Sequence, residues 1–526
     1  ISYKVWSSLY HHTSLMPKLT YLLSFVIFSI VLGFLLEQFS VFTNVNQPPA
    51  GLHAWRQTDC ASLAYLYAEE DRSFFDPAIH SQTSDFLETG DCAPSEAPIL
   101  FYWVGKCYQW FGVNEAYFRL TTLALFIIAL LSLFAQLFNL QKQFFESALP
   151  ILFWISSPIL LYYSNNFLSN MSGLSMAAIA FGFGYSYIQT QRSKHLVLAC
   201  VFFAIAGLFK VTALLGLMAF LLAFVVDALL SKKSIFNKKL LWIILAFVPT
   251  AAWVFYARWY NEAHLCYYFS TTTFPIWELD LHGIQYHLEL IAERWKGQFY
   301  PTASLVVLAA SIVLIFVRIK RINRLFLLWL LFASLGTLAY LAMQFQVLFA
   351  HDYYFTNLFI LPLMLMVEPF KTLSNISNKW LKLGVGIALF VCLGFAINDS
   401  KSEAEKRFLK FEDVTRERLM KLEPWLTRVG VKPSDKVVFA TDESNVSLYY
   451  IKRKGWTQYG YPIDENGKMS DSENYAFRLT VMAKHNAAYL LLYGDDALER
   501  FPELELHKDA FVADTAGLSV YRFKAN

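Results

Sequence analysis

The chain has 526 residues, 56% of them hydrophobic and only 16% charged. Soluble domains carry about 25% charged residues, so this composition excludes an ordinary soluble protein and indicates a chain that is mostly embedded in lipid. The net charge of +3 is too small to suggest a nucleic-acid partner.

The first predicted element is an apolar run over residues 19–41, in which Glu37 is the only acid. At ~1.5 Å per residue, a helix of this length crosses a hydrocarbon core of roughly 30 Å. Residues 1–18 contain Lys4 and Lys18, and the run is long enough to remain as an anchor. We therefore expect a membrane-spanning helix and no cleaved signal peptide.

The polar stretch 42–97 follows, and it contains His53-Ala54-Trp55-Arg56-Gln57-Thr58-Asp59. Residues 58–68 predict a short helix lying in the membrane plane, with Thr58 or Asp59 near its start. A carboxylate at the water–lipid boundary, beside a guanidinium and an indole, suits chemistry on a lipid-borne anionic substrate. Asp59 is therefore the catalytic candidate, a general base for an acceptor hydroxyl. The alternative is a helix-capping aspartate, which is common at such a position.

Three further residues of the stretch 42–97 have alternative readings. Arg56 either pairs with Asp59 at a spacing of three residues or holds a phosphate through its planar fork. His53 is more often a residue of the interfacial belt than a ligand. Glu96 stands two residues before Pro98, where it either binds a divalent cation or orients the acceptor, or is simply an acid in the first turn of a helix.

A short apolar stretch at 98–111 predicts a helix in or half-entering the interface. Beyond it, ten long apolar runs bring the predicted total to about eleven spans. They lie at 117–140, 148–164, 171–190, 195–209, 211–230, 239–258, 299–318, 324–346, 353–368 and 380–397.

Lysine and arginine recur on every second loop between these runs, which is typical of cytoplasmic loops. The basic residues are Lys142, Arg192, Lys194, Lys232, Lys233, Lys238, Lys239, Arg318, Lys320, Arg321, Arg324, Lys371 and Lys379. This pattern places the amino terminus inside the cell. It places residues 42–97, residues 259–298 and everything after residue 398 outside.

Several polar residues fall at the outward ends of the later spans. Ionisable groups in membrane segments are costly and usually functional, so each is a candidate to bind the phosphate or sugar of a substrate. For each, a structural alternative stays open: snorkelling for lysine, anchoring for arginine, the interfacial belt for tyrosine, and a solvated turn for asparagine. The candidates are Arg119, Asn170, Lys210, His351, Tyr353 and Tyr354.

Six cysteines are too few for a disulfide framework in a chain of this length. Cys60 and Cys92 fall in the same outward loop, where a bridge is permitted, but two unpaired thiols are the favoured reading.

The composition changes near Asp399, where charged residues become frequent. Strands are predicted at 437–440, 488–492 and 518–521, and helices at 443–453 and 473–485. Residues 1–398 are therefore a transmembrane domain, and residues 399–526 are a soluble α/β domain outside the membrane. This domain either covers the site and helps to recognise the acceptor, or serves packing and stability. The predicted fold class is a mainly α polytopic membrane protein plus a C-terminal α/β domain.

The order of these segments resembles the GT-C superfamily of integral-membrane glycosyltransferases. Its relatives include protein O-mannosyltransferases and the aminoarabinose transferase acting on lipid A. The chain is most similar to bacterial members described as dolichyl-phosphate-mannose-protein mannosyltransferase-like. The likeness rests on Trp55 to Asp59 after the first span, Glu96 to Pro98 before an apolar segment, Phe111-Gly112 with Arg119-Leu120, and His351 to Tyr354 at a late span.

This resemblance implies a glycosyltransferase of the bacterial inner membrane, with its site and C-terminal domain on the periplasmic side. The donor would be a sugar on polyprenyl phosphate, because nucleotide sugars are not available there, and the acceptor a glycan, lipid or protein. Asp59 would be the catalytic base of an inverting displacement, and Glu96 would lie in the metal or acceptor region. Lys210 and His351 to Tyr354 would lie near the donor phosphate.

The chain departs from the family pattern at two positions. The aminoarabinose transferase has a lysine after its glutamate, where this chain has Ala97, so phosphate binding must use another cation. Many relatives have an aspartate in the turn before the span at 171, where this chain has Asn170, so a second carboxylate role there is in doubt.

Two other classes stay open. A lipid-linked sugar transporter or flippase should show repeated halves or helices broken in mid-membrane, and the sequence shows neither. A non-catalytic membrane scaffold gives no reason for Asp59, Glu96, Lys210 and His351 to share one side of the membrane.

Overall fold

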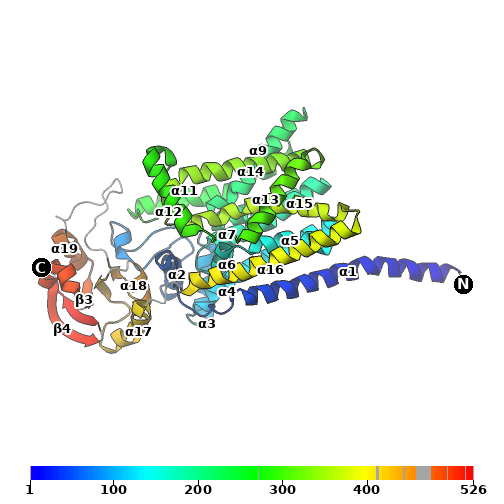
Figure 1. Cartoon of the computed structure of the whole chain (residues 1–526). Coiled ribbons are helices and arrows are strands. Elements are labelled where there is room, and N and C mark those ends of the chain that lie inside the picture. Colours follow the sequence, from blue (N-terminus) through cyan, green and yellow to red (C-terminus); the bar gives the residue numbers. More distant parts are fainter. Residues whose placement is uncertain are drawn as a thin grey trace. The chain divides into compact units, whose positions relative to one another are not determined.

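Figure 1 shows the computed structural model of the chain, which describes residues 2–269, 272–409, 414–441, 445–457, 475–494, 496–515 and 517–524. The chain forms two compact units, each assembled from three separate segments. The first, here called the helical unit, comprises Ile1–Asn46, Arg119–Ala252 and Thr272–Phe408. The second, here called the loop-and-sheet unit, comprises Gln47–Phe118, Trp253–Thr271 and Leu409–Asn526.

Long helices make up most of the helical unit, because a backbone in lipid must satisfy its hydrogen bonds internally. Their bounds are α1 (Ser2–Gln38), α4 (Ala116–Gln141), α5 (Phe144–Ile155), α6 (Pro158–Ser164), α7 (Asn170–Thr190), α8 (Ser193–Phe209), α9 (Leu215–Leu230), α10 (Lys238–Leu245), α11 (Val248–Ala263), α12 (Leu281–Trp295), α13 (Thr302–Val317), α14 (Arg324–Met343), α15 (Ile360–Phe370) and α16 (Lys379–Leu409). Two 3₁₀ segments matter for the site: η2 (Val211–Leu214) and η6 (Asp352–Phe359).

Every predicted apolar run is helical, but not every run is a long span. Among the described residues, 7 helices are long and apolar enough to cross a membrane, or 8 with the bent pair α5–α6. The predicted count of about eleven is therefore too high by this measure. Helices α8 and α13 are apolar but only 17 and 16 residues long, and α7 carries polar residues such as Ser172 and Ser175 that are buried in the unit.

The bent pair corrects one detail of the sequence prediction. Helices α5 and α6 meet at an angle of 83°, and Pro158 opens α6 after a break at Ser156 and Ser157. A broken helix thus exists among the described residues, although none was predicted from the sequence. It is a single bent pair among the described residues, so it does not supply the corresponding breaks in two halves that a transporter predicts.

The basic loops gather at one end of the helical unit, as their alternation along the chain predicts. One cavity is lined jointly by the loops near Gln191, Lys233 and Asn323. A second cavity is lined by both Arg321 and Lys371. A third is lined by residues between 373 and 379 and by Gln143. All five basic loops are linked in this way, so the unit has one basic end.

The loop-and-sheet unit combines short helices with one five-stranded sheet. The helices are α2 (Ala54–Glu69), α3 (Ile99–Phe111), α17 (Val414–Arg428), α18 (Asn445–Ile451), α19 (Tyr475–Lys484) and α20 (Ala497–Arg500). The strands are β1 (Lys436–Ala440), β2 (Gly455–Trp456), β3 (Ala487–Tyr493), β4 (Lys508–Thr515) and β5 (Leu518–Phe523), in the order β2-β1-β3-β5-β4.

The sheet is mixed. Strand β1 pairs in parallel with β2 and β3, whereas β5 is antiparallel to β3 and β4. The three predicted strands are confirmed, while β2 and β4 were not predicted because one is very short and the other is largely exposed. The predicted helices at 443–453 and 473–485 correspond to α18 and α19; residues 443–444 and 473–474 lie outside the described residues.

The loop at residues 42–97 pairs with the edge of this sheet. Gly455 of β2 donates its N–H to the carbonyl of His80 at 3.1 Å, and Ser81 forms a parallel bridge with Gly455. A Cβ on Gly455 would lie 1.9 Å from the carbonyl oxygen of Val437, so only glycine fits this position. Helix α16 continues to Leu409, and the described residues after it belong to the same compact unit as residues 47–118 and 253–271.

Candidate active site

The helix that carries Asp59 starts earlier than the sequence predicts. Helix α2 begins at Ala54, with His53 as its N-terminal cap residue in the left-handed region (φ 58°). Gln57 ties the preceding loop to the helix by donating to the carbonyls of Ala50 and Leu52 at 2.7 and 2.9 Å. Asp59 is therefore an interior residue of α2 and not its cap, so the capping alternative is wrong. His53 holds the start of the helix.

Close packing of two helices brings the acidic candidates together. A Cβ on Gly105 of α3 would lie 2.8 Å from Cβ of Tyr67 and 2.9 Å from the carbonyl oxygen of Ala64, so α2 and α3 meet at this glycine. Glu96 directly precedes α3, and this contact places it beside the first turn of α2.

Arg56 joins the two carboxylates. Its Nη2 donates to Oε1 of Glu96 at 2.8 Å, and its Nη1 lies 3.6 Å from Oδ2 of Asp59. The guanidinium also lies over the ring of Phe269, 5.1 Å from its centroid. Three candidates from the sequence, Asp59, Arg56 and Glu96, thus form one buried cluster. Glu96 is paired with a cation and is not an acid in the first turn of α3.

The two oxygens of Asp59 have different surroundings. Oδ1 accepts from the hydroxyl of Tyr268 at 2.9 Å and from the side-chain amide of Asn445 at 3.0 Å. Oδ2 is buried, and no described residue hydrogen-bonds to it. Oδ2 instead faces the guanidinium of Arg56, whose Nη1 lies 3.6 Å away.

Burial raises the pKa of Asp59 to about 6, and the Arg56 cation and the hydrogen bonds from Tyr268 and Asn445 limit the rise. The side chain has 0% exposed surface, and desolvation disfavours its charged form. A carboxylate with this pKa is ionised at neutral pH yet more basic than an ordinary aspartate, which suits a general base.

Two partners of Asp59 were missed by sequence reasoning. Tyr268 and Asn445 lie 209 and 386 residues along the chain from it. Neither belongs to a motif that the sequence analysis recognised. Tyr268 lies in an aromatic stretch, Cys266-Tyr267-Tyr268-Phe269, that carries no local signal for a contact with Asp59.

A disulfide positions Tyr268. Cys92 is bonded to Cys266, two residues before Tyr268. Cys60 is buried and is not part of this disulfide, but the expectation that Cys92 is unpaired is wrong. Its partner was missed because Cys266 lies in a different loop, 174 residues away. Asn261 adds a second tie, since its side chain exchanges hydrogen bonds with the backbone of Ala93 at 2.7 and 2.9 Å.

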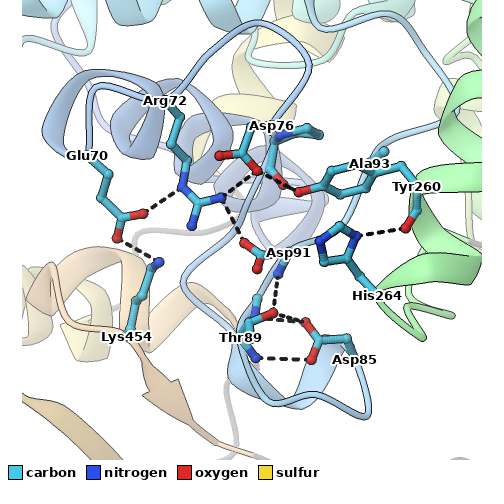
Figure 2. Close-up of polar contacts among 12 residues, drawn as sticks. Glu70, Arg72, Asp76, Asp85, Thr89, Asp91, Ala93, Tyr260, His264 and Lys454 are labelled. Carbon is cyan, nitrogen blue, oxygen red and sulfur yellow. Dashed lines mark hydrogen bonds and ion pairs between the residues drawn. The ribbon is translucent and has the colours of Figure 1, made fainter.

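Figure 2 shows a cluster of charges that binds the same two loops together and to the sheet region. Arg72 contacts Glu70, Asp76 and Asp91 at 2.6, 3.2 and 2.8 Å. The hydroxyl of Tyr260 donates to Asp76 at 2.8 Å, and Lys454 pairs with Glu70 at 2.6 Å. With its acids occupied by these internal cations, the cluster supports the position of the 253–271 segment.

The donor groups around Glu96 do not fit a divalent cation in this arrangement. Oε1 accepts from Arg56, and Oε2 accepts from the hydroxyl of Ser95 at 2.9 Å. In the part of the chain that the structure describes, no three His, Cys, Asp or Glu side chains converge as a metal site. Arg56 supplies the positive charge beside Glu96, and the proposed reaction contains no metal-dependent step.

The helical unit brings a second group of candidates together. The side chain of Asn170, in the first turn of α7, donates to the carbonyl of Tyr353 at 3.0 Å. Lys210 lies at the break between α8 and η2, and a Cβ on Gly173 would lie 3.0 Å from its Cβ. Asn357 of η6 donates to Thr212 at 3.0 Å. Three segments therefore meet in the helical unit: the turn at Asn170, the break at Lys210 and the segment His351–Tyr354.

Arg119 serves mainly to hold the neighbouring turn. Its Nη1 donates to the backbone and side-chain oxygens of Asn165 at 2.6 and 3.0 Å, and its guanidinium lies 4.7 Å from the centroid of Phe167. These contacts favour the anchoring role over binding a phosphate.

A buried ion pair beside the candidate tyrosines was also missed. Asp352 accepts from Nη2 of Arg407 at 2.5 Å and from the hydroxyl of Tyr163 at 2.6 Å. His351 and Tyr354 flank it at the start of η6 and are only half-buried, with ring centroids 5.6 Å apart. The ion pair thus fixes the backbone from which the His351 and Tyr354 side chains project.

Comparison with known proteins identifies this fold. No protein-family model matches the chain, and no curated protein matches it in sequence. A crystal structure of ArnT from Cupriavidus metallidurans in the apo state matches with a TM-score of 0.57 at 13% identity, over 95% of this chain and 98% of that one. The same protein bound to undecaprenyl phosphate matches with a TM-score of 0.55 at 12% identity, over 94% and 97%.

At this identity the likeness shows the fold. The chain is a multi-pass membrane protein that shares the fold of ArnT. The resemblance suggested by the short motifs is confirmed at this level.

Proposed function

We propose that the chain is a membrane glycosyltransferase that moves a sugar from a polyprenyl-phosphate donor to an extracytoplasmic acceptor. The observation that carries the proposal is the buried carboxylate of Asp59, whose Oδ2 accepts no hydrogen bond from the described residues and lies 3.6 Å from Arg56, which is itself paired with Glu96. The fold supports it, because ArnT has the same fold and has been crystallised with undecaprenyl phosphate.

The proposed reaction is a single displacement. The acceptor oxygen attacks the anomeric carbon of the donor sugar, and the bond from that carbon to the phosphate oxygen breaks. The electron pair leaves with the polyprenyl phosphate, and the acceptor proton passes to Oδ2 of Asp59. One displacement inverts the configuration at the anomeric carbon.

Cations offset the charge that grows on the leaving phosphate. Arg56 is the candidate in the loop-and-sheet unit, and its ion pair with Glu96 fixes its orientation. In the helical unit, Lys210 is the candidate on its chemistry, with the hydroxyls of Tyr353 and Tyr354 and the ring of His351 as further phosphate or sugar ligands. Asn170 is engaged with the backbone of Tyr353, which fits a positioning role.

The disulfide supports an extracytoplasmic position for the loop-and-sheet unit, since such bonds persist in oxidising compartments. It agrees with the alternation of the basic loops, which assigns residues 42–97, 259–298 and the C-terminal segment to the side opposite the cytoplasm. We therefore propose the bacterial inner membrane, with the site facing the periplasm and a glycan, lipid or protein as the acceptor.

The decisive variant is Asp59→Asn. Full-length protein should be incubated with labelled polyprenyl-phosphate sugars and a panel of acceptors, and both donor consumption and product should be followed. We expect Asp59→Asn to abolish transfer, because an amide cannot accept the proton. The melting temperature should be unchanged or higher, since the variant no longer ionises a buried carboxyl whose folded-state pKa is raised.

Glu37→Gln is the matched control, because it also removes one acid next to the membrane but lies outside the cluster. Undiminished turnover in Asp59→Asn would falsify the base assignment. Movement of the donor across vesicles without its consumption would instead favour the flippase.

A further inference from the structure

The basic end of the helical unit contains its own cavity, of about 780 Å³. The C-terminal ends of α7 and α9 and the N-terminal ends of α10 and α14 form its walls. Its size is within the range of small-molecule sites. Lys210, Tyr353 and the other phosphate candidates of the proposed reaction do not line it, so it is separate from them.

The walls carry an excess of positive charge. Lys233, Lys238, Lys239 and Arg324 line the cavity together with one acid, Asp227. Asp227 already pairs with Arg324 at 2.7 Å. The positive charges of the three lysines are therefore in excess over the negative charge in the cavity lining.

Two helices also begin at the cavity. Asn237 caps α10 by accepting from the N–H groups of Lys239 and Leu240, and Asn323 caps α14 by accepting from Leu325. Both cap residues line the cavity. The positive ends of two helix dipoles therefore add to the lysine charges, and the site favours an anion.

The surroundings of the cavity are apolar and exposed. Phe236, in the loop between α9 and α10, is 88% exposed, and Leu229 and Leu230 at the end of α9 are 57% and 60% exposed. Leu241 on α10 is exposed as well. Such side chains beside lysines would be unfavourable in water but suit a membrane interface, where acyl chains can cover them.

Inside the cavity, two aromatic residues complete an amphipathic lining. Lys239 places its ammonium group 5.2 Å from the ring centroid of Tyr187. Trp242 is half-buried in the wall, one turn further along α10. A ligand with an anionic head and an apolar tail matches a basic cavity with this lining and these exposed neighbours.

We propose that this cavity binds the head group of an anionic phospholipid of the surrounding membrane, with its acyl chains along α9 and α10. The site lies at the basic end, which the charge pattern assigns to the cytoplasmic leaflet. It is thus a lipid-binding site in addition to the proposed transferase site.

The test uses full-length protein in a neutral detergent, titrated with phosphatidylglycerol and followed by native mass spectrometry. Phosphatidylcholine with the same acyl chains and inorganic phosphate form two further arms. The variant is Lys233→Gln with Lys238→Gln, since both side chains are exposed and their replacement leaves the packing intact. The control is Lys142→Gln with Lys379→Gln, which removes the same charge from two basic loops that do not line this cavity.

We expect phosphatidylglycerol to bind the native protein more tightly than phosphatidylcholine. The cavity variant should weaken phosphatidylglycerol binding about ten- to thirtyfold, since a basic residue near an anionic lipid contributes roughly 1 kcal/mol. The control variant should bind like the native protein. Equal weakening in both variants would show diffuse charge attraction and would overturn the site. Displacement of the lipid by millimolar inorganic phosphate would reassign the cavity to a soluble anion, and so would phosphate binding without the lipid.

Discussion

The side chain of Asp59 combines two opposing influences that are each visible in the structure. Burial disfavours its negative charge, while Arg56, Tyr268 and Asn445 stabilise that charge. Both neutral donors act on Oδ1, so Oδ2 keeps its capacity to accept a proton. The balance gives a base that is ionised at neutral pH and still has a substantial affinity for the proton.

This balance predicts the pH dependence of transfer. Asp59 must be ionised to act, so activity should fall as the pH drops below about 6. Tyr268→Phe keeps the ring but removes a hydrogen bond to the ionised form. The pKa of Asp59 should therefore rise, and the acid limb of kcat/KM should move to higher pH by roughly one unit.

Tyr267→Phe is the matched control, since the neighbouring hydroxyl makes no described contact with Asp59. Measuring kcat/KM as a function of pH for both variants tests whether the acid limb moves. If Tyr268→Phe lowers kcat without moving the limb, the hydroxyl does not act through the charge on Asp59.

At the scale of elements, the site depends on two contacts that hold α2 and the 253–271 segment. Gly105 lets α3 approach α2 closely, which sets Glu96 beside Arg56. The Cys92–Cys266 disulfide and the Asn261–Ala93 hydrogen bonds hold the end of the segment that carries Tyr268. These contacts are a close helix packing, a covalent bond and two hydrogen bonds to backbone atoms, so they hold the segments that carry the cluster.

Removing the disulfide should therefore affect both stability and catalysis. We expect Cys92→Ser with Cys266→Ser to lose about 2–5 kcal/mol of folding free energy, which is typical for a native disulfide. Turnover should fall several-fold but not vanish, because Asn261 still ties the two loops. Thermal unfolding and steady-state kinetics would measure the two effects.

Cys392→Ser, which replaces a free cysteine elsewhere, should change neither quantity. Native turnover in the double variant would mean that the position of Tyr268 does not depend on the bridge.

At the scale of the whole molecule, the C-terminal segment completes the environment of the proposed base. Asn445 of α18 contacts Asp59, and Tyr449 of the same helix donates to Glu115 at 3.0 Å. Lys454 reaches Glu70 at 2.6 Å. Deleting residues 399–526 would thus remove a hydrogen bond from the carboxylate of Asp59, the proposed base. A loss of activity after such a deletion could not be assigned to acceptor recognition.

Point variants of α18 separate these roles. Asn445→Leu should lower kcat and move the acid limb to higher pH, because the carboxylate loses one of its two neutral donors. Tyr449→Phe removes the hydrogen bond from α18 to Glu115 and leaves the hydrogen bond from Asn445 to Asp59 in place. It should leave the pH profile unchanged, as kinetics on both variants would show. A matching shift in both would point to a displaced helix and not to the amide of Asn445.

The sequence by itself determined the elements whose signals are local. Long apolar runs identified the helices, because a lipid-embedded backbone leaves few other choices. The alternation of basic loops predicted that they share one end, and the cavities at that end confirm it. Arg56, Asp59 and Glu96 could be singled out because ionisable residues beside long apolar runs are rare and conspicuous. The alternating strands β1, β3 and β5 were also visible.

Only the tertiary structure decided which distant residues meet. Tyr268, Asn445 and the disulfide partner Cys266 reach the first outward loop across hundreds of residues, and no short pattern encodes such contacts. The strand β2 and the assembly of three segments into one unit were hidden for the same reason. Local propensity specifies an element, whereas its partners depend on how complete surfaces fit together.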